Sequence, residues 1–288
     1  MENKKKLPGF SVLLPIYYKE TVNNLNQCLE SLAAQTLPAA EIIIVKDGLL
    51  PNELNEVLIL WQGKLPLKII GYEENKGLAY ALNYGIQFCT CEFIARMDSD
   101  DICAPNRFEK QIKYFEEHDK TVIIGSNILE FYEDKNIINL IGERKYPVFT
   151  NKKSKSLFKG TPIAHPTMVI KTELLKKYKY NENTYLNEDI DLWFRLLIDG
   201  YSIENINELL LKYRITDKLF KRRNYRKAVN ELKIYCKNLI LINGFSLMLI
   251  FPLLRFFSRL LPAFCIKKIY LSKGRKKLYH HNDDDGVL

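Results

Sequence analysis

Two patterns of apolar and polar residues alternate along the first 125 residues. Short, mostly apolar runs predict strands, and longer stretches with apolar residues at helical spacing, such as Val22, Leu25 and Leu29, predict helices. The expected strands are Phe10–Pro15, Glu41–Lys46, Leu67–Gly71, Glu92–Met97 and Thr121–Gly125. The expected helices are Thr21–Gln35, Asn52–Trp61, Gly77–Phe88 and Pro105–His118. This alternation predicts an α/β fold with a mostly parallel sheet, which binds ligands at the carboxyl ends of its strands.

Three carboxylates follow the predicted strand Glu92–Met97 within four positions: Asp98, Asp100 and Asp101. Alternate side chains of an extended chain share a face, so Asp98 and Asp100 should point the same way. Neighbouring carboxylates repel each other unless a cation lies between them, and oxygen ligands suit Mg²⁺ or Mn²⁺. The pattern therefore predicts a divalent metal site, although a solvated acidic turn would give a similar sequence.

The segments after the other strands bear on nucleotide binding. The first strand and the turn after it, residues 13–20, contain no glycine, which argues against a dinucleotide-binding or Walker-type phosphate loop. Asp47 follows the second strand, where a carboxylate can accept the ring N–H of uracil, but Asp47-Gly48 is equally a common turn. Asn75 is expected to be a helix N-cap, and Gly77 permits close approach of an anion to the helix start.

The charge is unevenly distributed in this chain of 288 residues, whose net charge is +9. Residues 211–288 carry 18 Lys and Arg against 5 Asp and Glu, whereas the preceding residues are slightly acidic. This asymmetry predicts a near-neutral body with a basic appendage. The six cysteines form no paired framework and the start is not a secretory signal, so we expect reduced thiols and a cytoplasmic location.

The basic appendage also contains an apolar stretch, residues 239–255. It is shorter than the roughly 20 residues that span a bilayer, and Asn243, Gly244 and Pro252 interrupt it. Apolar faces flanked by Lys and Arg favour a helix lying on an anionic membrane. A true membrane span and a helical subdomain packed on the body are the alternatives. The last residues, His280–Leu288, are predicted to be disordered.

Four segments resemble family 2 glycosyltransferases in order and spacing: residues 14–17 (LPIY), 45–48 (VKDG), 75–85 (NKGLAYALNYG) and 97–101 (MDSDD). Residues 187–196 (NEDIDLWFRL) resemble the Glu-Asp motif of that family. Residues 164–167 (AHPT) are similar to bacterial enzymes that build O-antigen, capsule or amylovoran. Lys46 and Leu82 depart from the family, where many members have an acid and an arginine. The resemblance implies a GT-A fold.

The resemblance implies a role for each matching residue. Asp47 would bind uracil, and the nucleotide-sugar site would include Pro15, Tyr17, Glu20, Asn75, Lys76, Gly77, Asp98 and Asp101. Asp100, with Asp98, would bind Mn²⁺ or Mg²⁺. Asp189 would be the catalytic base with Glu188 beside it, while Asp191 is a weaker candidate that a helix cap or salt bridge would explain. His165 would contact the acceptor or a metal, although a lone histidine is usually structural. Outside the matching segments, Arg214 would contact diphosphate oxygens, with a solvated basic face as the alternative.

We therefore predict a metal-dependent, inverting glycosyltransferase that moves a sugar from a UDP-sugar to a polyprenyl-diphosphate-linked saccharide, forming a β linkage in O-antigen or capsule synthesis. The expected organisation is a GT-A domain at 1–215, with a nucleotide-sugar half at about 8–125 and an acceptor half at about 126–215. Residues 216–288 would be a basic amphipathic helical extension, peripheral on the inner face of the cell membrane. The alternatives are a nucleotidyltransferase acting on sugar phosphates and a basic nucleic-acid-binding protein. The basic residues flank aliphatic runs rather than exposed aromatics, which favours a membrane over nucleic acid.

Overall fold

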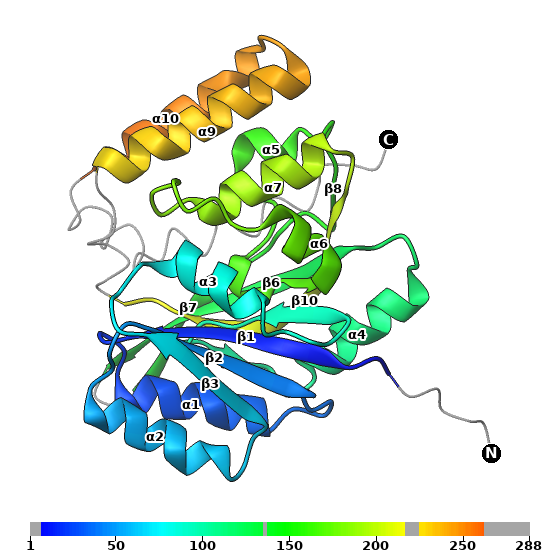
Figure 1. The fold of residues 1–288 in the computed structure, drawn as a ribbon. Coiled ribbons are helices and arrows are strands. Elements are labelled where there is room, and N and C mark those ends of the chain that lie inside the picture. Colours follow the sequence, from blue (N-terminus) through cyan, green and yellow to red (C-terminus); the bar gives the residue numbers. More distant parts are fainter. Residues whose placement is uncertain (1–6, 135–136, 217–224, 262–288) are drawn as a thin grey trace.

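The computed structural model describes residues 7–134, 137–216 and 225–261 (Figure 1). The strands are β1 (Phe10–Tyr17), β2 (Glu41–Asp47), β3 (Leu67–Tyr72), β4 (Phe93–Arg96), β5 (Ile102–Cys103), β6 (Ile123–Asp134), β7 (Ile137–Arg144), β8 (Phe149–Thr150), β9 (Val169–Lys171) and β10 (Ile203–Arg214). The α-helices are α1 (Val22–Ala33), α2 (Asn52–Gln62), α3 (Leu78–Ile86), α4 (Arg107–Glu117), α5 (Ser156–Lys159), α6 (Thr172–Tyr178), α7 (Glu188–Ile198), α9 (Tyr225–Asn243) and α10 (Ile250–Leu260). Two 3₁₀ turns, η1 (His165–Thr167) and η2 (Leu247–Leu249), complete the described elements.

The strands form one sheet in the order β3-β2-β1-β4-β9-β6-β10-β5. The first four strands are parallel, as predicted from the alternating pattern. The second half is mixed, because β9 runs antiparallel to both β4 and β6 while β6 and β10 are parallel. The prediction of a mostly parallel sheet is thus correct for the first half and wrong for the second.

Both faces of the sheet are covered by helices (Figure 1). Val12 and Leu14 belong to a core shared with α1, α2 and α4, whereas Leu13 points into the core that contains α3, α6 and α7. This alternation is the two-residue period of a strand. The layered arrangement aligns the carboxyl ends of β1, β2 and β4 along one edge, where the predicted ligand-binding residues follow.

All four expected helix starts agree with the structure within two residues, but the expected cap of α3 does not. Thr21 caps α1, because its Oγ1 accepts a hydrogen bond from the Asn24 backbone N–H at 3.2 Å. The N-cap of α3 is Gly77, at φ 90°, so the prediction that Asn75 caps this helix is wrong. The Asn75 side chain instead donates to the Asp47 carboxylate at 2.9 Å, and α3 begins only at Leu78.

Of the predicted extension, the structure describes residues 225–261, where α9 contacts α5, α7 and α10 (Figure 1). Glu231 of α9 is only 4% exposed and forms ion pairs with Arg255 (3.6 Å) and Arg259 (3.2 Å) of α10. Among the described helices, none combines the length and the apolar character needed to cross a membrane. The predicted disordered end, His280–Leu288, lies outside the described residues.

The close packing of Gly85 in α3 against the side chains of β1 and β2 gives a first prediction. A Cβ added at Gly85 would lie 2.4 Å from Leu13 Cδ1 and 2.6 Å from Val45 Cγ2, two fully buried side chains. Gly85→Ala should therefore lower the free energy of unfolding by about 1–2 kcal/mol, because overpacking outweighs the better helix propensity of alanine. Urea denaturation measures this difference.

Gly63→Ala is the matched control. Gly63 ends α2 with right-handed backbone angles and has no neighbour within 4 Å of the added Cβ. Its substitution should change stability by less than about 0.5 kcal/mol. Equal effects of the two substitutions would contradict the tight contact between α3 and the sheet.

Candidate active site

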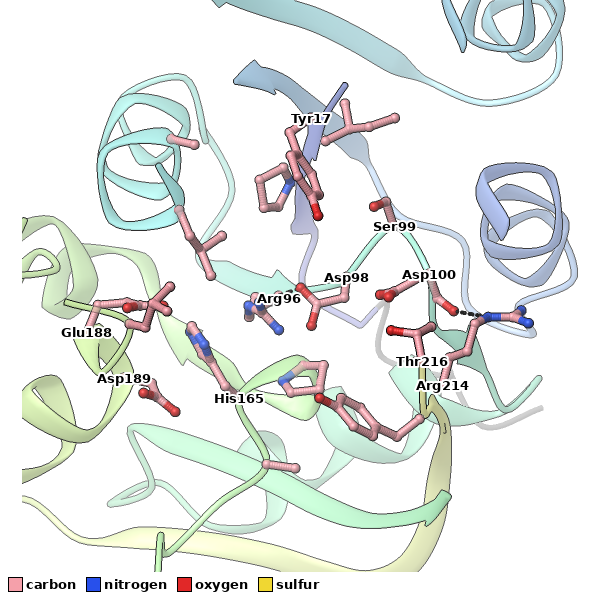
Figure 2. Close-up of a pocket in the computed structure, with 18 of the residues that line it drawn as sticks. Tyr17, Arg96, Asp98, Ser99, Asp100, His165, Glu188, Asp189, Arg214 and Thr216 are labelled. Atoms are coloured by element: carbon pink, nitrogen blue, oxygen red, sulfur yellow. Dashed lines mark hydrogen bonds and ion pairs between the residues drawn. The ribbon is translucent and has the colours of Figure 1, made fainter. Parts of the chain in front are cut away.

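A pocket of about 430 Å³ lies at the carboxyl ends of β1, β2 and β4, a size usual for small-molecule sites (Figure 2). Of the residues predicted from the sequence, twelve line it: Pro15, Tyr17, Glu20, Asp47, Asn75, Gly77, Asp98, Asp100, His165, Glu188, Asp189 and Arg214. Lys76 and Asp101 do not line it. The backbone N–H of Lys76 donates a hydrogen bond to Asp47, and the side chain of Asp101 is fully buried. The fold thus gathers the two acidic motifs, some ninety residues apart, around one cavity.

The acidic loop after β4 concentrates negative charge. Asp98, Asp100 and Asp101 each offer a carboxylate oxygen, and these oxygens lie within 4.8 Å of one another. Oδ1 of Asp101 accepts a hydrogen bond from the Arg214 backbone N–H at 2.9 Å, while its buried Oδ2 has no hydrogen-bond partner among the described residues. Burial, together with Asp100 and Asp98, raises the pKa of Asp101 well above its usual value. The oxygen-only donor set and the unsatisfied carboxylate oxygen fit a hard divalent cation.

Two buried arginines hold this loop. Arg96 donates to Asp98, and Nε of Arg214 donates to the Asp100 carbonyl oxygen at 2.7 Å. The other guanidinium nitrogens of Arg214 donate to Glu133 and Gln27. The Arg214 guanidinium is therefore engaged with the protein and anchors the acidic loop to β10.

Asp47 organises the loop that precedes α3. Its Oδ1 accepts hydrogen bonds from the Tyr72 hydroxyl (2.9 Å) and the Lys76 backbone N–H (2.7 Å). Its Oδ2 accepts hydrogen bonds from the Asn75 amide (2.9 Å) and the Gly77 backbone N–H (3.0 Å). A carboxylate that accepts this many hydrogen bonds fixes the backbone around it.

Glu20 joins the loop after β1 to the acidic loop. Its Oε2 accepts a hydrogen bond from the Ser99 hydroxyl at 2.6 Å, and its Oε1 accepts from the Thr21 backbone N–H at 2.8 Å. Ser99 lies between Asp98 and Asp100 in the chain, so this hydrogen bond ties the middle of the acidic loop to the loop after β1.

Glu188 and Asp189 occupy the first turn of α7, where the helix dipole favours negative charge. Burial and the neighbouring charge of Asp189 raise the pKa of Glu188 to about 7. Burial also raises the pKa of Asp189, against the opposing positive charge of Lys227. Asp191 pairs with Arg195 at 2.7 Å on the same helix, as its alternative structural role requires. Of the two carboxyls at the helix start, Glu188 thus has a pKa suited to proton transfer near neutral pH, and the pKa of Asp189 is raised in the same direction.

His165 and Arg96 lie between the two acidic groups (Figure 2). Burial and the charge of Arg96 lower the pKa of His165 well below its usual value, so its ring is neutral. Nε2 of His165 lies 2.8 Å from the hydroxyl of Tyr180. A neutral imidazole can accept or donate one hydrogen bond at each nitrogen.

Sequence reasoning missed three charged residues of the pocket, Arg96, Arg144 and Lys227. Arg96 is only 2% exposed, and its charge within an otherwise apolar strand was a usable signal. Lys227 gave no such signal, because it follows a run of other basic residues in the sequence.

Comparisons with known proteins agree on one family. The profile of Glycosyl transferase family 2 matches residues 11–179. "Amylovoran biosynthesis glycosyltransferase AmsE" of Erwinia amylovora is 38% identical over 272 residues, which cover 93% of this chain and 99% of the relative. The Escherichia coli "UDP-Gal:alpha-D-GlcNAc-diphosphoundecaprenol beta-1,3-galactosyltransferase" is 34% identical over 265 residues, covering 89% and 93%.

A solved structure shares the fold. The mannosyltransferase PcManGT from Pyrobaculum calidifontis, in complex with GDP-Man and Mn²⁺, superposes with a TM-score of 0.62 at 15% identity. The superposition covers 96% of this chain and 84% of that one. This likeness supports the expected GT-A-like arrangement of the sheet and helices.

The raised pKa of Glu188 gives a prediction that needs no substrate. Glu188 binds its proton more tightly in the folded state than in the unfolded state. The free energy of unfolding therefore falls as pH rises from about 4.5, the ordinary pKa, towards 7, the pKa in the folded protein. Glu188→Gln removes this cost and should stabilise the protein at pH 8 by up to about 3 kcal/mol. The gain should shrink towards pH 5, as thermal unfolding at both pH values would show.

Glu56→Gln, at an exposed position of α2, is the control and should show no such pH-dependent gain. A Glu188→Gln variant with the same stability difference from wild type at both pH values would contradict the raised pKa.

Proposed function

Because the chain belongs to glycosyl transferase family 2, we propose that it transfers a sugar from a UDP-sugar to a lipid-diphosphate-linked saccharide. The product would be a β-linked unit of a surface polysaccharide such as O-antigen or capsule. The names of the two relatives, one in amylovoran biosynthesis and one acting on a diphosphoundecaprenol-linked sugar, support this proposal. The observation that carries it is the placement of two acidic groups, at β4 and α7, around one pocket (Figure 2).

The donor would lie along the first half of the sheet. We assign uracil binding to Asp47 and to the loop that it organises, Asn75 to Gly77. Pro15, Tyr17 and Glu20 would form the rest of the nucleoside site, at the end of β1. If uracil binds Asp47 directly, its N–H must replace one of the present hydrogen bonds, so donor binding would rearrange this loop.

The diphosphate would lie beside the acidic loop, where Asp98 and Asp100 would hold Mn²⁺ or Mg²⁺ and Asp101 would orient the waters of the metal or the donor sugar. A divalent cation at this place neutralises the charge that develops on the leaving diphosphate. Arg214 anchors this loop, so we assign it a positioning role at the diphosphate side.

Proton transfer would occur at α7. We assign Asp189 as the base that takes the proton of the acceptor hydroxyl, with Glu188 beside it. The acceptor oxygen then bonds to the anomeric carbon as the bond from that carbon to the diphosphate oxygen breaks, and UDP leaves. Attack from the face opposite the leaving group inverts the anomeric centre, so an α-linked donor gives a β product. His165, between the two acidic groups, is placed to contact the sugars.

The C-terminal helices would attach the enzyme to the inner face of the cell membrane. On and before α10, large apolar side chains are exposed at Leu247, Leu254 and Phe257. Arg255 and Arg259 lie on the same helix, and the chain carries its positive charge in this region. An apolar face with flanking cations suits the surface of an anionic bilayer. A lipid-linked acceptor would be presented at that surface.

Activity measurements test this assignment. UDP release should depend on a UDP-sugar, on a GlcNAc-diphosphate-lipid analogue and on Mn²⁺ or Mg²⁺, and EDTA should abolish it. Asp100→Ala and Asp189→Asn should each lower kcat/KM at least about 100-fold, because one removes a metal ligand and the other the base. Glu56→Gln should retain full activity.

Turnover that survives EDTA and both substitutions would refute the proposed site. Incorporation of a nucleotide, rather than a sugar, into the product would favour the nucleotidyltransferase alternative.

Membrane attachment has its own test. The protein should sediment with vesicles that contain phosphatidylglycerol, even after nuclease treatment. The double substitution Leu254→Ser and Phe257→Ser should weaken the partition coefficient at least about tenfold, since it removes two buried apolar side chains from the bilayer surface.

Ile59→Ser with Leu60→Ser is the matched control, because these exposed apolar residues lie on α2, on the opposite side of the molecule from α10 (Figure 1). Equal sedimentation of all three proteins would exclude α10 as the attachment surface, and sedimentation lost on nuclease treatment would indicate nucleic acid binding.

A further inference from the structure

The start of α9 is attached to the segment that leads into the proposed base. The Asn187 side chain, at the N-cap of α7, donates to the Lys227 carbonyl oxygen at 3.3 Å. The Asn230 side chain donates to the Tyr185 carbonyl oxygen at 3.4 Å, and the Arg226 guanidinium lies 4.7 Å from the centre of the Tyr185 ring. Three contacts therefore join the first two turns of α9 to residues 185–187, immediately before Glu188.

Lys227, in the first turn of α9, lines the same pocket as Glu188 and Asp189. Burial lowers the pKa of Lys227, and the negative charges of Asp189, Glu231 and Glu188 oppose that shift. For Asp189, the positive charge of Lys227 is the largest influence that opposes the effect of burial. Lys227 and Asp189 are both half-buried, so the opposite charge of each favours the charged form of the other.

Lys227 also begins a row of alternating charges. Glu231 lies four residues further along α9, on the same side of the helix, and is almost fully buried. Its carboxylate pairs with Arg255 and Arg259 of α10. The row leads from Asp189 through Lys227 and Glu231 to the helix that carries the exposed apolar face.

The charged and titratable groups that influence Asp189 come from four places. Glu188 lies on the same helix as Asp189, and Arg96 lies on β4. The other groups that act on Asp189 directly are Lys227, Glu231 and Tyr235 of α9 and Tyr180, which follows α6. Arg259 of α10 acts indirectly, through Lys227. Arg96 also interacts with Asp98 and is shared between the two sides of the pocket. Lys227 is thus the cation most directly committed to Asp189.

We propose that Lys227 is a positioning residue for Asp189, keeping this carboxylate ionised and oriented, and that the α9–α10 hairpin is therefore a part of the catalytic site. The proposal rests on the assigned role of Asp189 as base. The C-terminal extension would then have a role in catalysis in addition to its proposed role in membrane attachment. A hairpin displaced from α7 would withdraw the ammonium group and raise the pKa of Asp189 further, leaving Arg96 as the cation that still opposes this shift.

The pH dependence of transfer tests this role. In Lys227→Met, the midpoint of the acidic limb of kcat/KM should move upward by about one pH unit or more, because loss of a nearby opposite charge raises the pKa of the base. At high pH, where the base is ionised in both proteins, the rates should converge. Lys227→Arg should restore the wild-type midpoint, since it keeps the charge.

Lys233→Met is the matched control, because Lys233 is exposed on the same helix. Its profile should equal that of the wild type. An unchanged midpoint in Lys227→Met, or a shift of equal size in Lys233→Met, would overturn the proposal.

A second measurement is independent of turnover. The Tm values of Lys227→Met, Asp189→Asn and the double variant at pH 8 form a double-mutant cycle. If the two side chains interact, Lys227→Met should lower Tm clearly in the wild type and much less in the Asp189→Asn background. Additive shifts would overturn the proposal. Absence of any transfer by the wild type would count against the proposed function alone, and this cycle would still decide the interaction.

Discussion

The acidic loop after β4 is the constraint on which the rest of the site depends. Three carboxylates within four residues repel one another, and the protein holds them together with two buried arginines from separate strands. Arg96 reaches Asp98 from the preceding strand, and Arg214 binds the loop from β10, across the sheet. Because these anchors belong to both halves of the fold, the loop forms only when the whole sheet is assembled. Even then one oxygen of Asp101 is left without a hydrogen bond, which a bound cation would compensate.

The first half of the fold could be predicted from the sequence because its elements follow simple periods. The expected segments from Phe10 to His118 match β1 to β4 and α1 to α4, with ends that differ by one or two residues. The second half could not be derived in this way, since nothing in the short apolar run of β9 shows that it pairs antiparallel with both β4 and β6. Asn75 was misjudged for a related reason. Its local pattern is that of a cap, but a carboxylate 28 residues earlier binds its side chain.

The site shows the same division between local and long-range information. The acidic motifs were visible because three carboxylates follow one strand within four positions, and because both motifs match a family pattern. Arg214 was expected to face a ligand, and the structure engages its guanidinium in the anchoring of the acidic loop, through contacts with Gln27 and Glu133 that no local pattern shows. Lys227 was hidden among basic residues that a membrane surface would explain. In the proposed account, the C-terminal hairpin has two uses: Lys227 acts on the base, and the exposed apolar side chains of α10 contact the bilayer.

The central claim is that one pocket holds the donor between the acidic loop and the start of α7. Crystals grown with UDP and Mn²⁺, measured at a wavelength where manganese scatters anomalously, test it most directly. The account predicts one anomalous peak beside Asp98 and Asp100, about 2.0–2.3 Å from a carboxylate oxygen of Asp100, in contact with the diphosphate and with uracil near Asp47. A manganese peak away from this loop, or UDP bound outside the pocket, would contradict it.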